Sequence, residues 1–175
     1  LLAIGASPVM SECSEDLRDL IVHAAALLIN IGTVTPDKVT YYKEAVKLAK
    51  AHEVPIVLDP VGCHAGAYRL SVVLDLIKTD AISLLRGNQS EIKAIYDALN
   101  TNHKVNNSLS GKGVDGEQVE DSAIITYRLA RQINCPVVAT GEEDYVSDGT
   151  RVFAVPHGHP IMTAVTGTGC LLGAV

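Results

Sequence analysis

The sequence predicts an α/β fold in which a mainly parallel central sheet lies between two layers of helices. Helical and strand-like segments alternate along most of the 175 residues, which is typical of parallel sheets joined by right-handed crossovers. The composition agrees, because 47% of the residues are hydrophobic with one phenylalanine and no tryptophan, as expected of aliphatic strands covered on both faces. A chain of this length can bury one core, so we expect residues 1–175 to form a single domain.

Five segments have the apolar spacing of amphipathic helices. Ser14 can cap the first helix, and Thr35 followed by Pro36 marks the beginning of the second. Asn88, with Glu91 three residues later, has the spacing of a capping box at the start of the fourth. The expected helices cover residues 14–25, 36–52, 70–77, 89–99 and 117–133.

Short apolar segments between these helices predict the strands of the sheet. Residues 86–88 are expected to end the third strand, and Asp148 with Gly149 is a turn signal between two antiparallel strands. Residues 100–116 are polar and glycine-rich, so they are expected to form a loop. The expected parallel strands cover residues 27–31, 55–59, 81–85 and 136–140, and the hairpin strands cover residues 145–147 and 151–155.

Charge and composition exclude several classes of protein. The net charge of −6 argues against a nucleic-acid partner. No apolar run approaches the roughly 18 residues of a membrane span, so no membrane association is expected. The four cysteines, at positions 13, 63, 135 and 170, form no Cys-x-x-Cys pair, which disfavours a zinc or thioredoxin-type site. Scattered cysteines are typical of a reducing compartment, so a cytoplasmic location is expected.

Polar or glycine-rich residues follow each expected parallel strand, and a further glycine-rich turn lies near residue 168. Ligands of open parallel sheets bind outside the carboxyl ends of the strands. These ends should lie side by side, so the sequence predicts one common cleft. The segments concerned are residues 32–33, 59–62, 86–88, 140–141 and 167–169.

The turn Gly167-Thr168-Gly169 leads into Cys170 and an apolar segment. A helix that starts here would present backbone N–H groups and a positive dipole end to an anion. The same position would lower the pKa of the Cys170 thiol and let it accept a proton from a substrate hydroxyl. The alternatives are a plain loop-to-helix turn and a buried, unreactive thiol. The spacing matches neither a dinucleotide fingerprint nor a P-loop.

Three charged residues are further candidates. Arg86 ends a buried strand, where it needs an anion; a phosphate and a neighbouring carboxylate are both suitable partners. Asp59 could hold Mg²⁺ directly or through water, or could simply form the turn before Pro60. Glu91 is fully explained as the partner of Asn88 in the capping box.

Taken together, these stretches resemble hydroxyethylthiazole kinase, a member of the ribokinase-like superfamily. The resemblance extends over nearly the whole chain in the family's order. It implies a ribokinase-like α/β/α domain that uses ATP to phosphorylate the hydroxyl of 4-methyl-5-(2-hydroxyethyl)thiazole in thiamin biosynthesis. The matching stretches are GASPVM (5–10), NIGTVTP (30–36), VLDPVG (57–62), LRGNQSEI (85–92), ATG (139–141), VSDG (146–149), GHP (158–160) and VTGTGC (165–170).

The resemblance also implies roles for residues at matching positions. Met10 and Gly167 would contact the thiazole alcohol, and Cys170 would stand where many related kinases carry an aspartate base. Gly167, Thr168 and Gly169 would form the anion hole for the transferring phosphoryl group, which needs little besides positioning and charge neutralisation.

The same resemblance places the nucleotide and the metal. Arg86 and Thr140 would contact ATP, and Asp59 and Glu91 would lie near Mg²⁺. The family implies a homotrimer with each thiazole site between subunits, so that Met10 would reach the site across an interface.

The sequence departs from the family's pattern in three respects. Members of the family are longer at both ends, so this chain is expected to be a fragment that lacks the first strand and the last helices. Cys63 and His64 follow DPVG where small residues are usual, and residues 113–116 read GVDG rather than GVDS. Two alternatives stay open: another ribokinase-like kinase, for a pyrimidine or a sugar, and a noncatalytic truncated paralogue. GASPVM argues against the first alternative.

Overall fold

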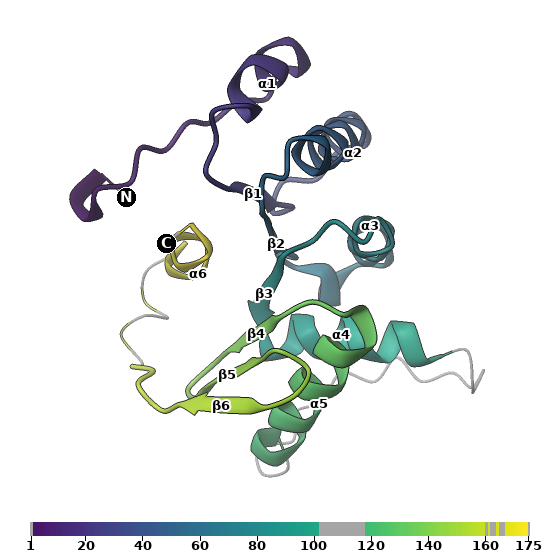
Figure 1. The fold of residues 1–175 in the computed structure, drawn as a ribbon. Helices are drawn as coiled ribbons and strands as arrows, with labels where there is room; N and C mark the ends of the chain where they lie inside the picture. Colours follow the sequence, from purple (N-terminus) through teal and green to yellow (C-terminus); the bar gives the residue numbers. More distant parts are fainter. Residues whose placement is uncertain (1, 102–117, 160, 162–163, 165–166, 175) are drawn as a thin grey trace.

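The computed structural model describes residues 2–101, 118–159, 161, 164 and 167–174, apart from the side chains of residues 118–121. Its centre is a sheet of six strands in sequential order (Figure 1). Strands β1 to β4 are parallel, and β5 and β6 continue the sheet in antiparallel fashion. The strands are β1 (Leu27–Asn30), β2 (Ile56–Asp59), β3 (Leu84–Asn88), β4 (Val137–Thr140), β5 (Asp144–Ser147) and β6 (Val152–Val155). The predicted α/β class and mainly parallel sheet are confirmed.

Helices α2 to α5 cover one face of the sheet, and α6 lies on the other face (Figure 1). The sequential strand order explains this arrangement. Right-handed crossovers that all advance in the same direction place their helices on the same side of a sheet. The helices are α1 (Ser14–Ile21), α2 (Pro36–Ala51), α3 (Ala67–Ile77), α4 (Gln89–Asn100), α5 (Gln118–Ile133) and α6 (Thr168–Gly173), with 3-10 turns at Leu2–Ile4 and Cys63–Ala65.

The capping signals are confirmed by hydrogen bonds. Thr35 Oγ1 accepts from the backbone N–H of Lys38 at 3.3 Å. At the start of α4, Asn88 Oδ1 accepts from the N–H of Glu91, and Glu91 Oε2 accepts from the N–H of Asn88, each at 2.8 Å. Each reciprocal bond satisfies a backbone donor that would otherwise be left at a helix end.

The largest differences from the predicted boundaries are in α1, α3 and β3, and α3 begins at Ala67 rather than at residue 70. Helix α1 ends at Ile21, four residues early, because the chain then turns through a bond from the N–H of Ala24 to the carbonyl of Ile21. Strand β3 covers residues 84–88 rather than 81–85, since the register of Arg86 against Val138 continues the ladder with β4. The strand thus begins and ends three residues later than predicted, and residues 86–88 are its last three residues rather than the residues that follow it.

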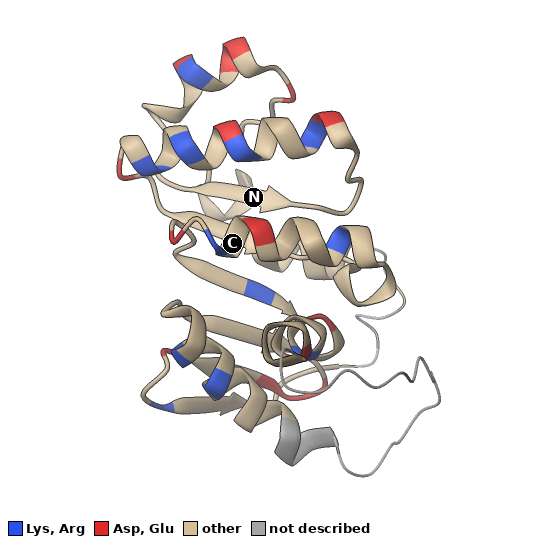
Figure 2. Cartoon of the chain, turned by 90° about the vertical axis from the view of Figure 1, so that its right-hand side faces the viewer, with Lys and Arg blue, Asp and Glu red and all other residues tan. Residues whose placement is uncertain are grey.

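The core between the sheet and helices α2 to α5 is aliphatic, as the composition predicts. Figure 2 shows that charged residues gather on the helices and loops, while most of the sheet is uncharged. Among the described residues, no helix is both long and apolar enough to cross a membrane. The expected loop at 100–116, with GVDG at 113–116, lies almost entirely outside the described residues. Side chains with no more than 1% exposure in this core include Ile31, Ile56, Leu58, Val73, Leu76, Leu85, Ile92, Ile95, Leu129 and Val137.

Candidate functional site

A cleft opens at the carboxyl ends of β2, β3 and β4, beside the beginning of α6. It brings together three of the parallel-strand ends predicted to meet and the glycine-rich turn. The end of the first predicted strand does not contribute, since neither Gly32 nor Thr33 lines the cleft. Three other candidates are also outside the lining, namely Gly141, Thr168 and Met10. The residues that line it are Asp59, Val61, Arg86, Asn88, Glu91, Thr140, Gly167, Gly169 and Cys170.

Asp59 and Arg86 form a buried ion pair at the centre of this cleft. Arg86 Nη1 lies 3.6 Å from Asp59 Oδ2, and the two side chains are 8% and 1% exposed. Arg86 Nη2 also donates to Thr140 Oγ1 at 3.3 Å. The carboxylate partner proposed for Arg86 therefore exists, and the two residues expected to contact ATP contact each other directly. Arg86 Nε is buried and has no hydrogen-bond partner among the described residues.

The surroundings of Asp59 make its carboxyl group harder to ionise than an exposed one. Burial raises the pKa of Asp59 to about 6, and the negative charge of Glu91 acts in the same direction. Arg86 and a hydrogen bond from Asn30 oppose this rise in the pKa. One cation thus faces two carboxylates. A further cation near Asp59 and Glu91 would offset the cost of keeping both charged.

Glu91 has a structural role that both of its oxygens serve. Oε1 accepts from the N–H of Gly62 and Oε2 accepts from the N–H of Asn88, each at 2.8 Å. The carboxylate thus connects the loop after β2 to the start of α4. A Cβ atom at Gly87 would lie 3.0 Å from Oε2 and 3.1 Å from Pro60 Cγ, so a larger residue here would crowd both side chains.

The described residues contain no group of three or more His, Cys, Asp or Glu side chains that could hold a metal ion. Two carboxylates in one cleft nevertheless fit Mg²⁺, which usually binds through one or two carboxylates and completes its coordination with water and phosphate oxygens. Asp59 and Glu91 are the carboxylates that line the cleft.

Helix α6 lies against the ion pair, with its start near Arg86 and its last residue, Gly173, near Asp59. Gly167 precedes it with φ +91°, a left-handed conformation that favours glycine. A Cβ atom at Gly169 would lie 3.5 Å from both Nη1 and Nη2 of Arg86. Cys170, the third residue of α6, is exposed and lines the cleft. The positive end of the helix and the guanidinium group therefore face the same space.

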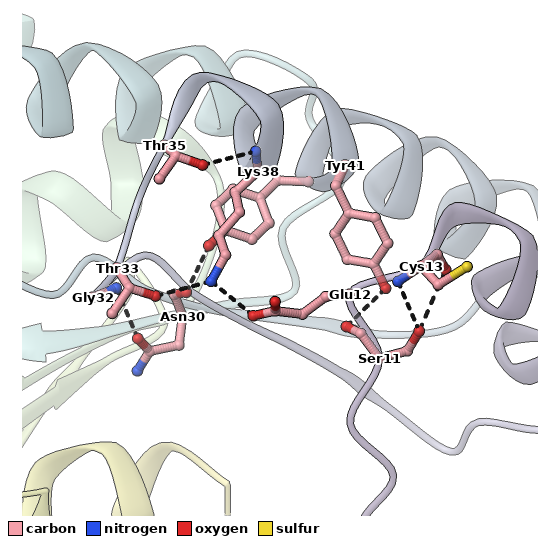
Figure 3. A network of polar contacts seen from close by, with 10 residues as sticks. Ser11, Glu12, Cys13, Asn30, Gly32, Thr33, Thr35, Lys38 and Tyr41 are labelled. Atoms are coloured by element: carbon pink, nitrogen blue, oxygen red, sulfur yellow. Dashed lines mark hydrogen bonds and ion pairs between the residues drawn. The ribbon is translucent and has the colours of Figure 1, made fainter.

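Met10 lies apart from the cleft, on the N-terminal segment. Its side chain is 97% exposed. Two side chains of α2 hold the residues that follow it (Figure 3). Lys38 Nζ bridges Glu12 Oε1 at 2.7 Å and Thr33 Oγ1 at 3.1 Å, and Tyr41 Oη donates to the carbonyl of Ser11 at 3.0 Å.

Cys63 and His64, the unusual pair after DPVG, have different surroundings. Cys63 is 1% exposed, and burial raises the pKa of its thiol to about 12. Its Sγ donates to the carbonyl of Glu91 at 3.6 Å, so it packs beneath the capping box. His64 is exposed on the short turn that follows.

Asn30 is the important residue that the sequence reasoning missed. It ends β1 directly opposite Asp59 in the parallel register, and its Nδ2 donates to Asp59 Oδ2 at 3.1 Å. The available signal was a lone amide at the end of an otherwise apolar strand. Its meaning depends on the register with β2, which the sequence alone does not specify.

The fold and the cleft define an α/β protein whose candidate ligand site lies at the carboxyl ends of parallel strands. Comparison with known proteins makes this assignment specific. The model of the hydroxyethylthiazole kinase family matches residues 1–175. The chain belongs to the hydroxyethylthiazole kinase family.

Relatives and a solved structure agree with this assignment. The chain is 50% identical over its 175 residues to a protein of Streptococcus agalactiae serotype III (strain NEM316) named hydroxyethylthiazole kinase, and 46% identical to one of Streptococcus suis (strain 05ZYH33) with the same name. It spans 65% and 64% of the lengths of these two relatives, and all of it is covered. A structure of hydroxyethylthiazole kinase protein from Pyrococcus horikoshii OT3 matches with a TM-score of 0.85 and 38% identity, covering 99% of this chain and 61% of that one.

Proposed function

We propose that the protein containing this chain transfers the γ-phosphoryl group of ATP to the hydroxyl of 4-methyl-5-(2-hydroxyethyl)thiazole. The observation that carries the proposal is the meeting of Arg86 and Thr140 with the first residues of α6 in one cleft. Membership in the hydroxyethylthiazole kinase family supports the substrate.

In the proposed reaction, the substrate hydroxyl oxygen attacks the γ-phosphorus while the bond from phosphorus to the β,γ-bridging oxygen breaks. The products are the thiazole phosphate ester and ADP, and the hydroxyl proton passes to the thiolate of Cys170. Such a transfer depends on positioning and on neutralising the charge of the phosphoryl oxygens. Gly167, Thr168 and Gly169 form the proposed anion hole, because a helix start presents backbone N–H groups and a positive dipole end.

Nucleotide binding is assigned to Arg86 and Thr140. The Arg86 guanidinium is held by Asp59 and Thr140 with its Nη atoms toward Gly169. A charged phosphate oxygen would accept from donors of this kind. Its unpartnered, buried Nε supports this assignment, since a buried polar group ordinarily has a partner.

Asp59 and Glu91 are the residues proposed to hold Mg²⁺, directly or through water. Bound there, the ion would neutralise charge on the transferring phosphate. The chain's own contribution is to keep two buried carboxylates and the guanidinium of Arg86 together in the lining of one cleft.

We further propose a homotrimer with a thiazole site between subunits. A Met10 side chain that is 97% exposed and does not line the cleft of its own chain supports a contact across an interface. Other exposed apolar side chains accompany it on the same segment, namely Leu2, Ile4 and Val9. The proposed cytoplasmic location is supported by four cysteines that are all free. Light scattering that found a monomeric full-length protein would contradict the trimer.

Measurement of ATP turnover by the full-length protein, with and without the thiazole alcohol, tests the proposal. Turnover that depends on the thiazole alcohol is expected. Turnover only with a pyrimidine or a sugar would indicate a different small-molecule kinase. Absence of turnover with all these acceptors would favour a noncatalytic relative.

A further inference from the structure

Asn30 connects Asp59 of the candidate site with the loop after β1 and with helix α2. Its Nδ2 donates to Asp59 Oδ2 at 3.1 Å, and its Oδ1 accepts from the backbone N–H of Gly32 at 2.9 Å. Its backbone carbonyl accepts from Tyr42 Oη at 3.2 Å. Figure 3 shows the side chain between the end of β1 and the loop that follows. Both ends of the amide are therefore engaged, and the residue is half-buried.

These two bonds fix the orientation of the amide. The N–H of Gly32 can only donate, so it requires the oxygen of Asn30 on its side. The NH₂ group must then face Asp59, where it acts as a donor to a carboxylate. Gly32 is part of this arrangement, since a Cβ atom there would lie 3.0 Å from Asn30 Oδ1.

Asp59 is held from two sides through the same oxygen. Asn30 Nδ2 and Arg86 Nη1 both approach Oδ2, at 3.1 Å and 3.6 Å. Within the described part of the chain, no hydrogen bond or ion pair reaches Oδ1 of this carboxylate. The two donors thus hold one oxygen and leave the other for a ligand of the cleft.

We propose that Asn30 is a positioning residue. Its hydrogen bond to Asp59 Oδ2 orients the carboxylate so that Oδ1 can bind the magnesium ion of the nucleotide complex. This inference rests on the proposed function, because it concerns the metal of that reaction. The inference gives a role in metal binding to a residue that does not line the cleft. It also extends the metal site to the loop after β1. Partners that orient a metal ligand typically contribute about 10- to 100-fold to metal affinity.

The test measures the affinity of the full-length protein for ADP by calorimetry, with and without Mg²⁺. Asn30→Leu keeps the approximate shape of the side chain and removes both hydrogen bonds. The gain in ADP affinity that Mg²⁺ provides should fall by about 10- to 100-fold, while the affinity without Mg²⁺ should change little. Asn100→Leu is the matched control, because Asn100 Nδ2 also donates two hydrogen bonds but lies exposed at the end of α4. It should behave like the parent.

Asn30→Asp distinguishes the hydrogen bond to Asp59 from the one to Gly32, and it keeps the proposal testable if Asn30→Leu does not fold. Aspartate can still accept from Gly32, but it cannot donate to Asp59. If Mg²⁺ increases the ADP affinity of Asn30→Asp as little as that of Asn30→Leu, the proposal is supported. If it increases the ADP affinity of Asn30→Asp as much as that of the parent, or more, the proposal is overturned. An unchanged gain in a folded Asn30→Leu overturns it as well. If the unsubstituted protein neither turns over the thiazole alcohol nor binds ADP in a magnesium-dependent way, the proposed function itself is contradicted.

Discussion

Arg86 Nη1 lies 3.6 Å from Asp59 Oδ2, between two neighbouring parallel strands and next to α6, with Gly169 beside Arg86 and Gly173 beside Asp59. The pair is almost completely buried, and the guanidinium also donates to Thr140. A group that is both an ion-pair partner and a candidate phosphate ligand should affect stability and nucleotide use. These two effects can be measured separately.

Arg86→Ala should raise the KM for ATP much more than the KM for the thiazole alcohol. Loss of a charge-assisted hydrogen bond costs about 1.5–3 kcal/mol, which corresponds to roughly 10- to 100-fold in KM. Steady-state kinetics with each substrate varied in turn measure the two values. Arg131→Ala is the control, since Arg131 is an exposed arginine on α5.

The same variant should also lower the melting temperature, because it leaves the Asp59 carboxylate buried without its cation. Combining Arg86→Met with Asp59→Asn removes both charges and should recover much of the lost stability without restoring ATP use. A variant with a lower melting temperature but an unchanged KM for ATP would show that Arg86 is only an ion-pair partner.

Glu91→Gln should destabilise the protein. The carboxylate accepts from the N–H groups of Gly62 and Asn88, whereas the glutamine amide offers only one acceptor oxygen. One partly buried N–H is then left without its partner, at a cost of about 1 kcal/mol. Urea unfolding measures the change in the free energy of unfolding. Asp97→Asn is the control, because its exposed pair with Lys93 contributes about 0.5 kcal/mol or less; equal losses in both variants would contradict the structural role of Glu91.

The sequence was sufficient where local chemistry determines the structure. The capping box of Asn88 and Glu91 follows from residue types at fixed spacing, and the structure confirms it. It was not sufficient where tertiary partners decide. Arg86 was expected just after the last residue of the third strand, yet it lies inside β3, where Asp59 faces it from β2. Asn30 was overlooked for the same reason, since its role depends on the register of β1 against β2.

Reaction of the folded protein with iodoacetamide at about pH 8 should distinguish its four cysteines. Cys13 and Cys170 are exposed, so they should be modified. Cys63 and Cys135 should be protected, because burial raises the pKa of these thiols to about 12 and about 11, and the thiolate is the reactive form. Mass spectrometry of the digested protein identifies the modified sites. Rapid modification of Cys63 in protein that remains folded would contradict its placement beneath the capping box.

The raised pKa of Cys63 also predicts how stability depends on pH. The folded state keeps the thiol protonated above the ordinary value of 9.0, whereas the unfolded state releases the proton there. The unfolded state then binds fewer protons, so the free energy of unfolding should fall as the pH rises above about 9. Cys63→Ala removes this contribution and should show a shallower decline in alkaline urea titrations. A decline as steep as that of the parent would show that other groups cause it.

Cys170 provides the most direct test of the proposed chemistry. As the base, it must lie at the start of α6 next to the substrate hydroxyl, and its exposure in the cleft agrees with this role. General bases typically contribute about 10²- to 10⁴-fold, but the loose transition state of phosphoryl transfer leaves less for a base to do. We therefore expect Cys170→Ala and Cys170→Ser to lower kcat to a similar extent, near the lower end of this range.

Cys170→Asp should retain activity, because aspartate is ionised at neutral pH and restores a base at the same position. A thiol without a catalytic role would give a different result, with alanine and serine fully active and aspartate giving no advantage over them, because Cys170 is exposed and not part of the core. Measurement of kcat and the melting temperature for the three variants decides between these results. Cys13→Ser is the matched control, since Cys13 is exposed, donates to Glu15 and lies outside the cleft. Full activity in both Cys170→Ala and Cys13→Ser would exclude the thiol as the base and leave the positive end of α6 and Arg86 as the groups that act on the phosphoryl oxygens.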